Sequence, residues 1–171
     1  MRCAGVSFFW PRRLSKKLRP EARLAEFLLK RIKPMPGERD LAMLLRNMKP
    51  EIHEGVFVFC SIPAEKEIPA TLRPVHMFRE REGTTFVVRR EEAEGAGLSY
   101  QFASRLITLT VHSSLEAVGF LAAITGRLAE AGISVNAVSA FYHDHLFVPD
   151  DRADEALRHL QDMSRLRGAA E

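Results

Sequence analysis

The chain has 171 residues, of which 46% are hydrophobic and 27% charged, and its formal net charge is +3. This composition is typical of a globular protein with room for one ordinary domain or two small ones. The sequence has no apolar run of 18 residues or more, so a membrane-spanning helix is not expected. Its two cysteines, Cys3 and Cys60, lie in unlike contexts. That arrangement favours a reducing, cytoplasmic location over a disulfide framework.

The positive charge is concentrated at the N-terminus. Residues 1–34 contain ten Lys or Arg and two Glu, whereas the other 137 residues contain 15 basic and 20 acidic side chains. The body of the chain is therefore mildly acidic, and we expect neither nucleic acid nor membrane as its partner. We interpret residues 1–34 as a basic extension that is disordered or precedes a true start at Met35. A targeting peptide and a basic amphipathic helix are the alternatives.

Residues 35–103 supply helices and strands but suggest no closed topology of their own. Asp40 is expected to cap a short helix that Pro50 stops. The three prolines between residues 62 and 75 indicate a loop. In chain order the expected elements are a helix after Asp40, a strand at 56–60, the loop at 62–75, a strand at 84–88 and a brief helix at 91–97.

Residues 104–164 have a clearer pattern of alternating strands and amphipathic helices. The expected elements are a strand at 106–111, a helix capped by Ser114 and ended by Gly132 as its C′ glycine, strands at 133–142 and 145–148, and a helix after Asp150. The order β-α-β-β-α is one strand short of a ferredoxin-like βαββαβ module. The missing strand comes either from the first half or from a second copy of the chain, and residues 165–171 are left as a C-terminal tail.

Two strings carry a resemblance to a known family. Residues 107–120, ITLTVHSSLEAVGF, resemble the strand-to-helix entry of the ACT-domain superfamily. Residues 141–149, FYHDHLFVP, narrow this to small bacterial tandem ACT-domain proteins, which are related to the ACT pairs of aspartate kinases and to cytosolic arginine sensors. The resemblance covers Met35 to Ser164. It implies an α+β ferredoxin-like ACT fold with two halves packed together, and effector binding, usually of amino acids, between paired modules.

The predicted ligand site is the turn into the first helix of the second half. A helix N-terminus carries unpaired N–H groups and a partial positive charge that attract a carboxylate. The resemblance adds Gly119 for close approach and Asn136 for the ligand's amino group. Alternatively, Ser114 only caps the helix, Gly119 only permits packing and Asn136 only satisfies its own turn. The predicted ligand-binding residues are Ser113, Ser114, Leu115, Glu116, Ala117, Val118, Gly119, Asn136, Phe141 and His143.

Metal and catalytic sites are not predicted. His143 and His145 would share a face of a strand and suit Zn²⁺, but the hairpin offers no fourth ligand. These residues form an ordinary turn or line the ligand cleft instead. His112 precedes two serines, yet no acid is placed to orient it. We therefore expect a non-catalytic, cofactor-free sensor that binds a small molecule, namely an amino acid, and forms a homodimer. The alternative is an interaction module without ligand that docks on a metabolic enzyme or transporter.

Overall fold

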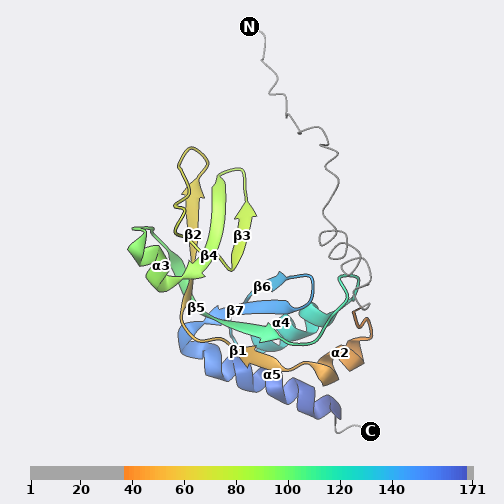
Figure 1. The fold of residues 1–171 in the computed structure, drawn as a ribbon. Helices are drawn as coiled ribbons and strands as arrows, with labels where there is room; N and C mark the ends of the chain where they lie inside the picture. Colours follow the sequence, from red (N-terminus) through yellow and green to blue (C-terminus); the bar gives the residue numbers. More distant parts are fainter. Residues whose placement is uncertain (1–36, 169–171) are drawn as a thin grey trace, which may run out of the picture. The chain divides into compact units, whose positions relative to one another are not determined.

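The computed structural model describes residues 37–168, and the predictions for residues 1–34 and for a start at Met35 lie outside this part of the chain (Figure 1). Seven strands form one sheet in the order β3-β4-β2-β5-β7-β6, with β1 also paired to β5. The strands are β1 Pro50–Ile52, β2 Phe57–Pro63, β3 His76–Arg79, β4 Gly83–Arg89, β5 Gln101–Leu109, β6 Asn136–Ser139 and β7 Asp144–Pro149. The helices are α2 Leu41–Asn47, α3 Arg90–Gly95, α4 Phe120–Glu130, the short 3₁₀ helix η1 Asp150–Arg152 and α5 Ala153–Gly168.

The second module is completed by a strand from the first half. β1 lies antiparallel to β5, with Ile52 opposite Ile107, and so supplies the strand that residues 104–164 lack. The resulting order β1-β5-β7-β6, with α4 and α5 as its helices, is the ferredoxin-like arrangement. Of the two sources left open by the sequence, the first half is the one the structure shows. Figure 1 shows β1 beside β5, with α5 running along the strands.

The core of this module lies between its sheet and three helices. Ile107, Leu109, Leu146 and Val148 point from β5 and β7 into this core. Each such aliphatic side chain contributes about 1.5–3 kcal/mol when it is removed from water. The other core residues come mainly from the helices: Leu44, Leu45 and Met48 at α2, Phe120, Ile124 and Leu128 from α4, and Ala153, Ala156 and Leu160 from α5.

Helix α2 begins where the sequence predicts. The Asp40 side chain accepts a hydrogen bond from the Met43 N–H at 2.8 Å, so it caps the first turn. The helix ends before Pro50, the first residue of β1. Its Leu44 and Leu45 are buried. The cap and the apolar stripe are both local signals, which is why this element was predicted.

The first module has the same strand arrangement with one helix missing. β2, β3 and β4 pair antiparallel, and the start of β5 lies beside β2, where Phe57 is opposite Ser104. A loop that follows Pro63 and contains Pro69 and Pro74 connects β2 to β3 in place of a helix. Proline lacks an N–H and disfavours helix interiors, so this connection stays irregular. α3 and the buried Leu72 of the loop cover one face of the module.

The predicted start of α4 is wrong. Ser114 was expected to cap a helix there, but α4 begins at Phe120 and its N-cap is Gly119, with φ of +90°. The Ser114 N–H donates instead to the Glu38 carbonyl at 2.9 Å, so the segment after β5 pairs with the backbone at Glu38. Residues 115–118 therefore precede the helix, with a turn at 115–116. Gly119 adopts the left-handed conformation in which the chain changes direction into the helix.

The hairpin also differs from its prediction. β6 covers only Asn136–Ser139 of the expected 133–142, and the turn occupies the following residues, with the Ala140 N–H donating to the His143 carbonyl. Asp144 is the first residue of β7 rather than a turn residue. Beyond the expected boundary at Ser164, α5 continues to Gly168.

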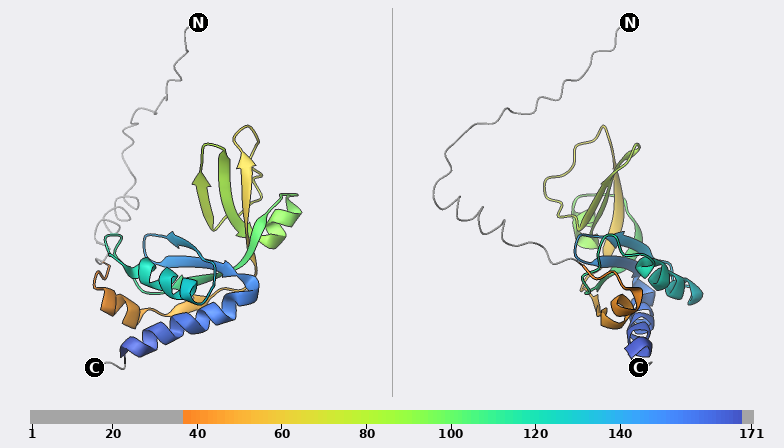
Figure 2. Two further views of the ribbon diagram at one scale, coloured as in Figure 1. Left: turned by 180° about the vertical axis from the view of Figure 1, so that it is seen from behind. Right: turned by 90° about the vertical axis from the view of Figure 1, so that its right-hand side faces the viewer.

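The two faces of the second module's sheet differ in what covers them. Side chains alternate between faces along a strand, and cross-strand partners share a face. Leu146 and Val148 therefore face the helices, whereas His145 and Phe147 point to the opposite face, where Phe147 packs with Phe57 and Leu106. Figure 2 shows the helices gathered on one side of these strands. Within residues 37–168 no helix has the length and apolarity needed to span a bilayer.

Candidate functional site

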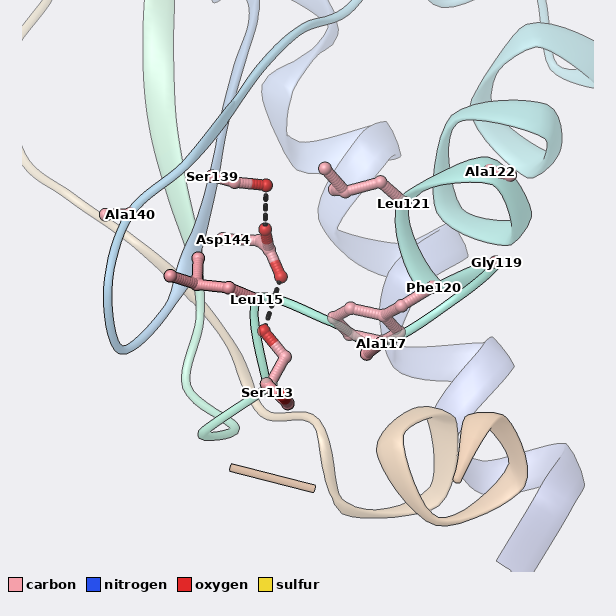
Figure 3. Close-up of a pocket in the computed structure, with 11 residues that line it drawn as sticks. Ser113, Leu115, Ala117, Gly119, Phe120, Leu121, Ala122, Ser139, Ala140 and Asp144 are labelled. Carbon is pink, nitrogen blue, oxygen red and sulfur yellow. Dashed lines mark hydrogen bonds between the residues drawn. The ribbon is translucent and has the colours of Figure 1, made fainter. Parts of the chain in front are cut away.

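A cavity of about 160 Å³ lies on the helix-covered face, between the turn after β5, the start of α4 and the β6–β7 hairpin (Figure 3). We call it the entry-turn cavity. Its volume is below the range of about 300–1,000 Å³ typical of drug-sized ligands, so it suits a small metabolite. Its lining residues are Ser113, Ser114, Leu115, Ala117, Gly119, Phe120, Leu121, Ala122, Ser139, Ala140 and Asp144.

Asp144 is the charged group of this cavity and is only 5% exposed. The Ser113 hydroxyl donates to Asp144 Oδ2 at 2.8 Å, and the Ser139 hydroxyl donates to Oδ1 at 2.6 Å (Figure 3). Both serine protons are therefore used on the carboxylate, and the remaining lone pairs of all three side chains are acceptors. Among the described residues no Lys, Arg or His forms an ion pair with Asp144. A buried carboxylate with this surrounding suits a ligand that brings a positive charge.

The start of α4 contributes hydrogen-bond donors to the same cavity. The amides of the first helical turn, Phe120 to Ala122, have no carbonyl partner within a helix. No side chain caps this end, because its N-cap is Gly119. An uncapped helix N-terminus carries about half a positive charge and attracts anions. The cavity thus has acceptors at Asp144 and donors at α4.

The entry turn is held in place by backbone contacts with the N-terminal segment. The Glu38 N–H donates to the His112 carbonyl, and the Ser114 N–H donates back to the Glu38 carbonyl at 2.9 Å. A Cβ added to Gly37 would lie 2.5 Å from the Ser114 nitrogen, so only glycine fits beside this turn. The position of Ser113 against Asp144 therefore depends on residues 37–38.

Half of the predicted ligand-binding residues line the entry-turn cavity, namely Ser113, Ser114, Leu115, Ala117 and Gly119. Glu116 is exposed and pairs with Arg39 at 3.0 Å. Val118 and Phe141 are 83% and 55% exposed and lie outside the lining. The His143 ring nitrogen Nδ1 lies 3.3 Å from the Val111 carbonyl, also outside the lining.

The structure does not bring Asn136 to this cavity. Asn136 is paired with Phe147, so it lies on the face of the sheet opposite Asp144. It is also three residues from Ser139, about 10 Å along the strand. The position that faces the entry turn is Ser139, which is paired with Asp144.

Sequence reasoning missed six lining residues. Phe120, Leu121 and Ala122 were missed because the helix cap was placed at Ser114, five residues before the observed N-cap Gly119. Ser139, Ala140 and Asp144 were missed because the hairpin turn was placed at 143–144. Strand alternation offered a signal: with Leu146 and Val148 taken as core, period two places Asp144 on the same face.

Within residues 37–168 no group of three or more His, Cys, Asp and Glu side chains could hold a metal ion. His143 contacts the Val111 carbonyl and His145 contacts Thr108, so the two histidines of the hairpin have different partners. Neither lines the entry-turn cavity.

The chain matches two family models described as ACT domain, one over residues 36–105 and the other over residues 101–162. A Vibrio cholerae protein of unknown function, described as a possible transport protein, is 44% identical in sequence. The match covers 72% of this chain and 95% of that protein with a TM-score of 0.66. The chain therefore belongs to the ACT-domain family, as a tandem pair of ACT domains.

More distant solved structures share the fold. An Agrobacterium tumefaciens protein aligns with a TM-score of 0.60 at 18% identity, over 68% of this chain and 89% of that one. The aspartate kinase of Clostridium acetobutylicum aligns with a TM-score of 0.52 at 8% identity, over 68% of this chain and 34% of the kinase. No curated protein matches the chain. ACT domains are regulatory modules that generally bind amino acids.

Proposed function

We propose that this protein is a non-catalytic sensor that binds a small α-amino acid in the entry-turn cavity. The observation that carries the proposal is the buried Asp144 carboxylate, which faces the same cavity as the uncapped N-terminus of α4. The ligand's ammonium group donates to Asp144 and to the serine lone pairs. Its carboxylate accepts from the amides of Phe120 to Ala122.

The size of the cavity limits the side chain of the ligand. Its volume of about 160 Å³ leaves room for an amino acid with a short side chain. Leu115, Phe120 and Leu121 supply the large apolar side chains of its lining (Figure 3). We therefore expect glycine, alanine, serine or a molecule of similar size to bind more tightly than an aromatic amino acid.

A thermal-shift screen of the twenty amino acids, followed by calorimetry, tests the proposal. The amino acid that binds is compared with its analogues lacking the amino or the carboxyl group, and we expect both analogues to lose binding. If no amino acid raises the melting temperature, the proposal is wrong.

Two isosteric changes then locate the site. Asp144→Asn removes the charge that faces the ammonium group, and we expect at least about a tenfold loss of affinity, the usual effect of losing a charge-assisted hydrogen bond. Asp154→Asn, on the first turn of α5, is the matched control and keeps wild-type affinity. Asn136→Ala is also expected to bind normally. Unchanged binding by Asp144→Asn would place the ligand elsewhere.

One observation favours a second function, docking on another protein. Leu115, Val118, Phe141 and Tyr142 are exposed by 54% to 83%, around the entry turn and the β6–β7 turn. The Phe141 and Tyr142 rings pack together with centroids 4.8 Å apart. Val118→Glu keeps the cavity lining intact, so a docking function is lost in this variant while amino acid binding is retained.

A homodimer is proposed through the β3 edge of the sheet. β3 and β6 end the strand order, and an unpaired edge strand is a template for another chain. At β3 the edge carries exposed Val75, Met77 and Phe78. Phe78→Lys is expected to convert the dimer to a monomer in analytical ultracentrifugation. A wild-type protein that sediments as a monomer contradicts this proposal.

A further inference from the structure

A second cavity, of about 260 Å³, lies on the face of the sheet opposite α2, α4 and α5. We call it the histidine cavity, because His53, His76 and His145 line it together with Thr108. The apolar side chains of Leu106 and Phe147 form much of the remaining wall. Since Thr108 and His145 point away from Asp144 and the helices, this cavity is separate from the entry-turn cavity.

The polar side of the histidine cavity is a hydrogen-bonded chain. The Thr108 hydroxyl oxygen lies 2.7 Å from His53 Nε2 and 2.9 Å from His145 Nδ1. Thr108 is only 6% exposed, so this hydroxyl is fixed between the two rings. A hydroxyl has one proton, so it donates to one imidazole and accepts from the other. The outer nitrogen of one neutral ring is then an N–H donor, and that of the other ring is an acceptor.

The remaining ring nitrogens are available to a ligand. Among the described residues, His53 Nδ1, His145 Nε2 and both nitrogens of His76 have no hydrogen bond to the protein. His53 is an exposed residue, and in His76 and His145 no fully buried nitrogen lacks a partner, so these free nitrogens are accessible. They are free donors or acceptors beside an apolar wall.

The groups around the histidine cavity determine which charge on a ligand is favoured. Its lining contains three imidazoles and no Asp or Glu. Burial lowers the pKa of His145, and the neighbouring His143 and His53 lower it further, while Asp144 opposes this. An anion placed among these rings would favour the protonated form of His145 and raise its pKa, whereas a cation would lower that pKa further.

We propose that the histidine cavity binds a small apolar carboxylate, an aromatic or branched-chain organic acid. The carboxylate accepts hydrogen bonds from the imidazole N–H groups, and the apolar body lies against Leu106 and Phe147. His53 and His76 belong to the first half of the chain, while Thr108 and His145 belong to the second. The occupied site therefore connects both ACT modules.

The six histidines of the chain allow a direct test by proton NMR. Phenylacetate is titrated into the full-length protein while the ring resonances are followed against pH. We expect the pKa of His145 to rise and the ring resonances of His53 and His76 to shift, while the resonances of His112 and His159 stay unchanged. Phenylacetamide, which has the same shape without the charge, produces no rise. A response shared equally by His159, or no response at the three cavity histidines, overturns the proposal.

Two variants confirm the location by different means. Thr108→Val keeps the shape of the side chain and removes the hydroxyl that orients both rings, so we expect about tenfold weaker binding of phenylacetate. Val138→Phe fills the cavity from the edge strand β6 and should abolish binding. It provides the test if Thr108→Val does not fold. His159→Gln is the matched control. We expect Asp144→Asn to retain phenylacetate binding, so this test is independent of whether an amino acid binds in the entry-turn cavity.

Discussion

Gly119 is the residue at which the chain turns into α4, and its φ of +90° is the reason the helix begins there. We predict that Gly119→Ala lowers the free energy of unfolding by about 1–2 kcal/mol, because a side chain is disfavoured in this conformation. A Cβ at this position would meet only Leu41 Cδ2, at an ordinary 3.5 Å, so steric overlap adds little. Urea denaturation followed by circular dichroism measures the loss.

Gly126 provides the matched control for Gly119. It lies inside α4, and a Cβ there would meet nothing within 4 Å. Gly126→Ala should therefore raise the free energy of unfolding by about 0.5–1 kcal/mol, the usual gain of alanine over glycine in a helix. Equal effects of the two substitutions would show that α4 starts elsewhere.

His145 makes the stability of the protein depend on pH. Burial lowers its pKa below the ordinary value of 6.5, so the unfolded chain binds this proton more readily than the folded protein. The contribution to stability is complete above that ordinary value. It is lost progressively as the pH falls through 6.5 toward the folded pKa.

We predict that His145→Gln weakens this acid destabilisation. Glutamine does not titrate, and its amide can still hydrogen-bond to Thr108. Melting temperatures measured between pH 7.5 and 5.5 should fall less in His145→Gln than in the wild type. His159→Gln, which lies outside the histidine cavity, is the matched control.

Among the elements, the segment before α2 supports the entry-turn cavity without lining it. Gly37 lies against the backbone of Ser113 and Ser114, with only 2.5 Å between its added Cβ and the Ser114 nitrogen. We predict that Gly37→Ala displaces residues 37–38, breaks the hydrogen bonds to the entry turn and lowers amino acid affinity. Calorimetry with the amino acid found in the screen measures the effect.

Gly95→Ala is the matched control for Gly37→Ala. Gly95 ends α3 and would place its Cβ in open space, so affinity should stay at the wild-type value. If Gly37→Ala also binds normally, the entry turn is positioned by its own residues alone.

The elements that could be predicted from the sequence are those with local signals. The Asp40 cap of α2, the buried strand β2 and the prolines of the β2–β3 loop act within a few residues of their own position. β1 could not be predicted in this way. Its three residues, Pro50 to Ile52, have no pattern of their own and form a strand only because they pair with β5.

Only the part of the candidate site that has a local sequence signal was predicted. The Ser113–Gly119 stretch was found because its sequence resembles a family motif. The partners of that stretch are Asp144, which is 31 residues beyond Ser113 and is itself bonded to Ser139, and the backbone of Glu38. The face on which each hairpin residue lies follows from strand register, and a misplaced turn exchanges the two faces.

At the scale of the whole molecule, the two ACT modules share β5. Its start pairs with β2 of the first module, and its remainder pairs with β1 and β7 of the second. The two family models likewise overlap at residues 101–105. We propose that the second module requires β1 and residues 101–103 in addition to the 104–164 predicted from the sequence.

We predict that both modules unfold in one cooperative step. Cys60 lies in the core of the first module at 2% exposure, and burial raises the pKa of its thiol, so it reacts with a thiol reagent only after unfolding. In a Cys3→Ser background, the free energy derived from Cys60 labelling should equal that from circular dichroism. A lower value from labelling would mean that the first module opens alone.

Side chains alternate between the two faces of the sheet along β7, so neighbouring residues of this strand serve different cavities. Asp144 belongs to the entry-turn cavity and the next residue, His145, to the histidine cavity, with only the thickness of the sheet between them. In a deep mutational scan scored separately for each ligand, sensitivity along this strand would therefore have a period of two. Each ligand preference could then diverge among homologues by substitutions at alternate positions, leaving the other preference unchanged.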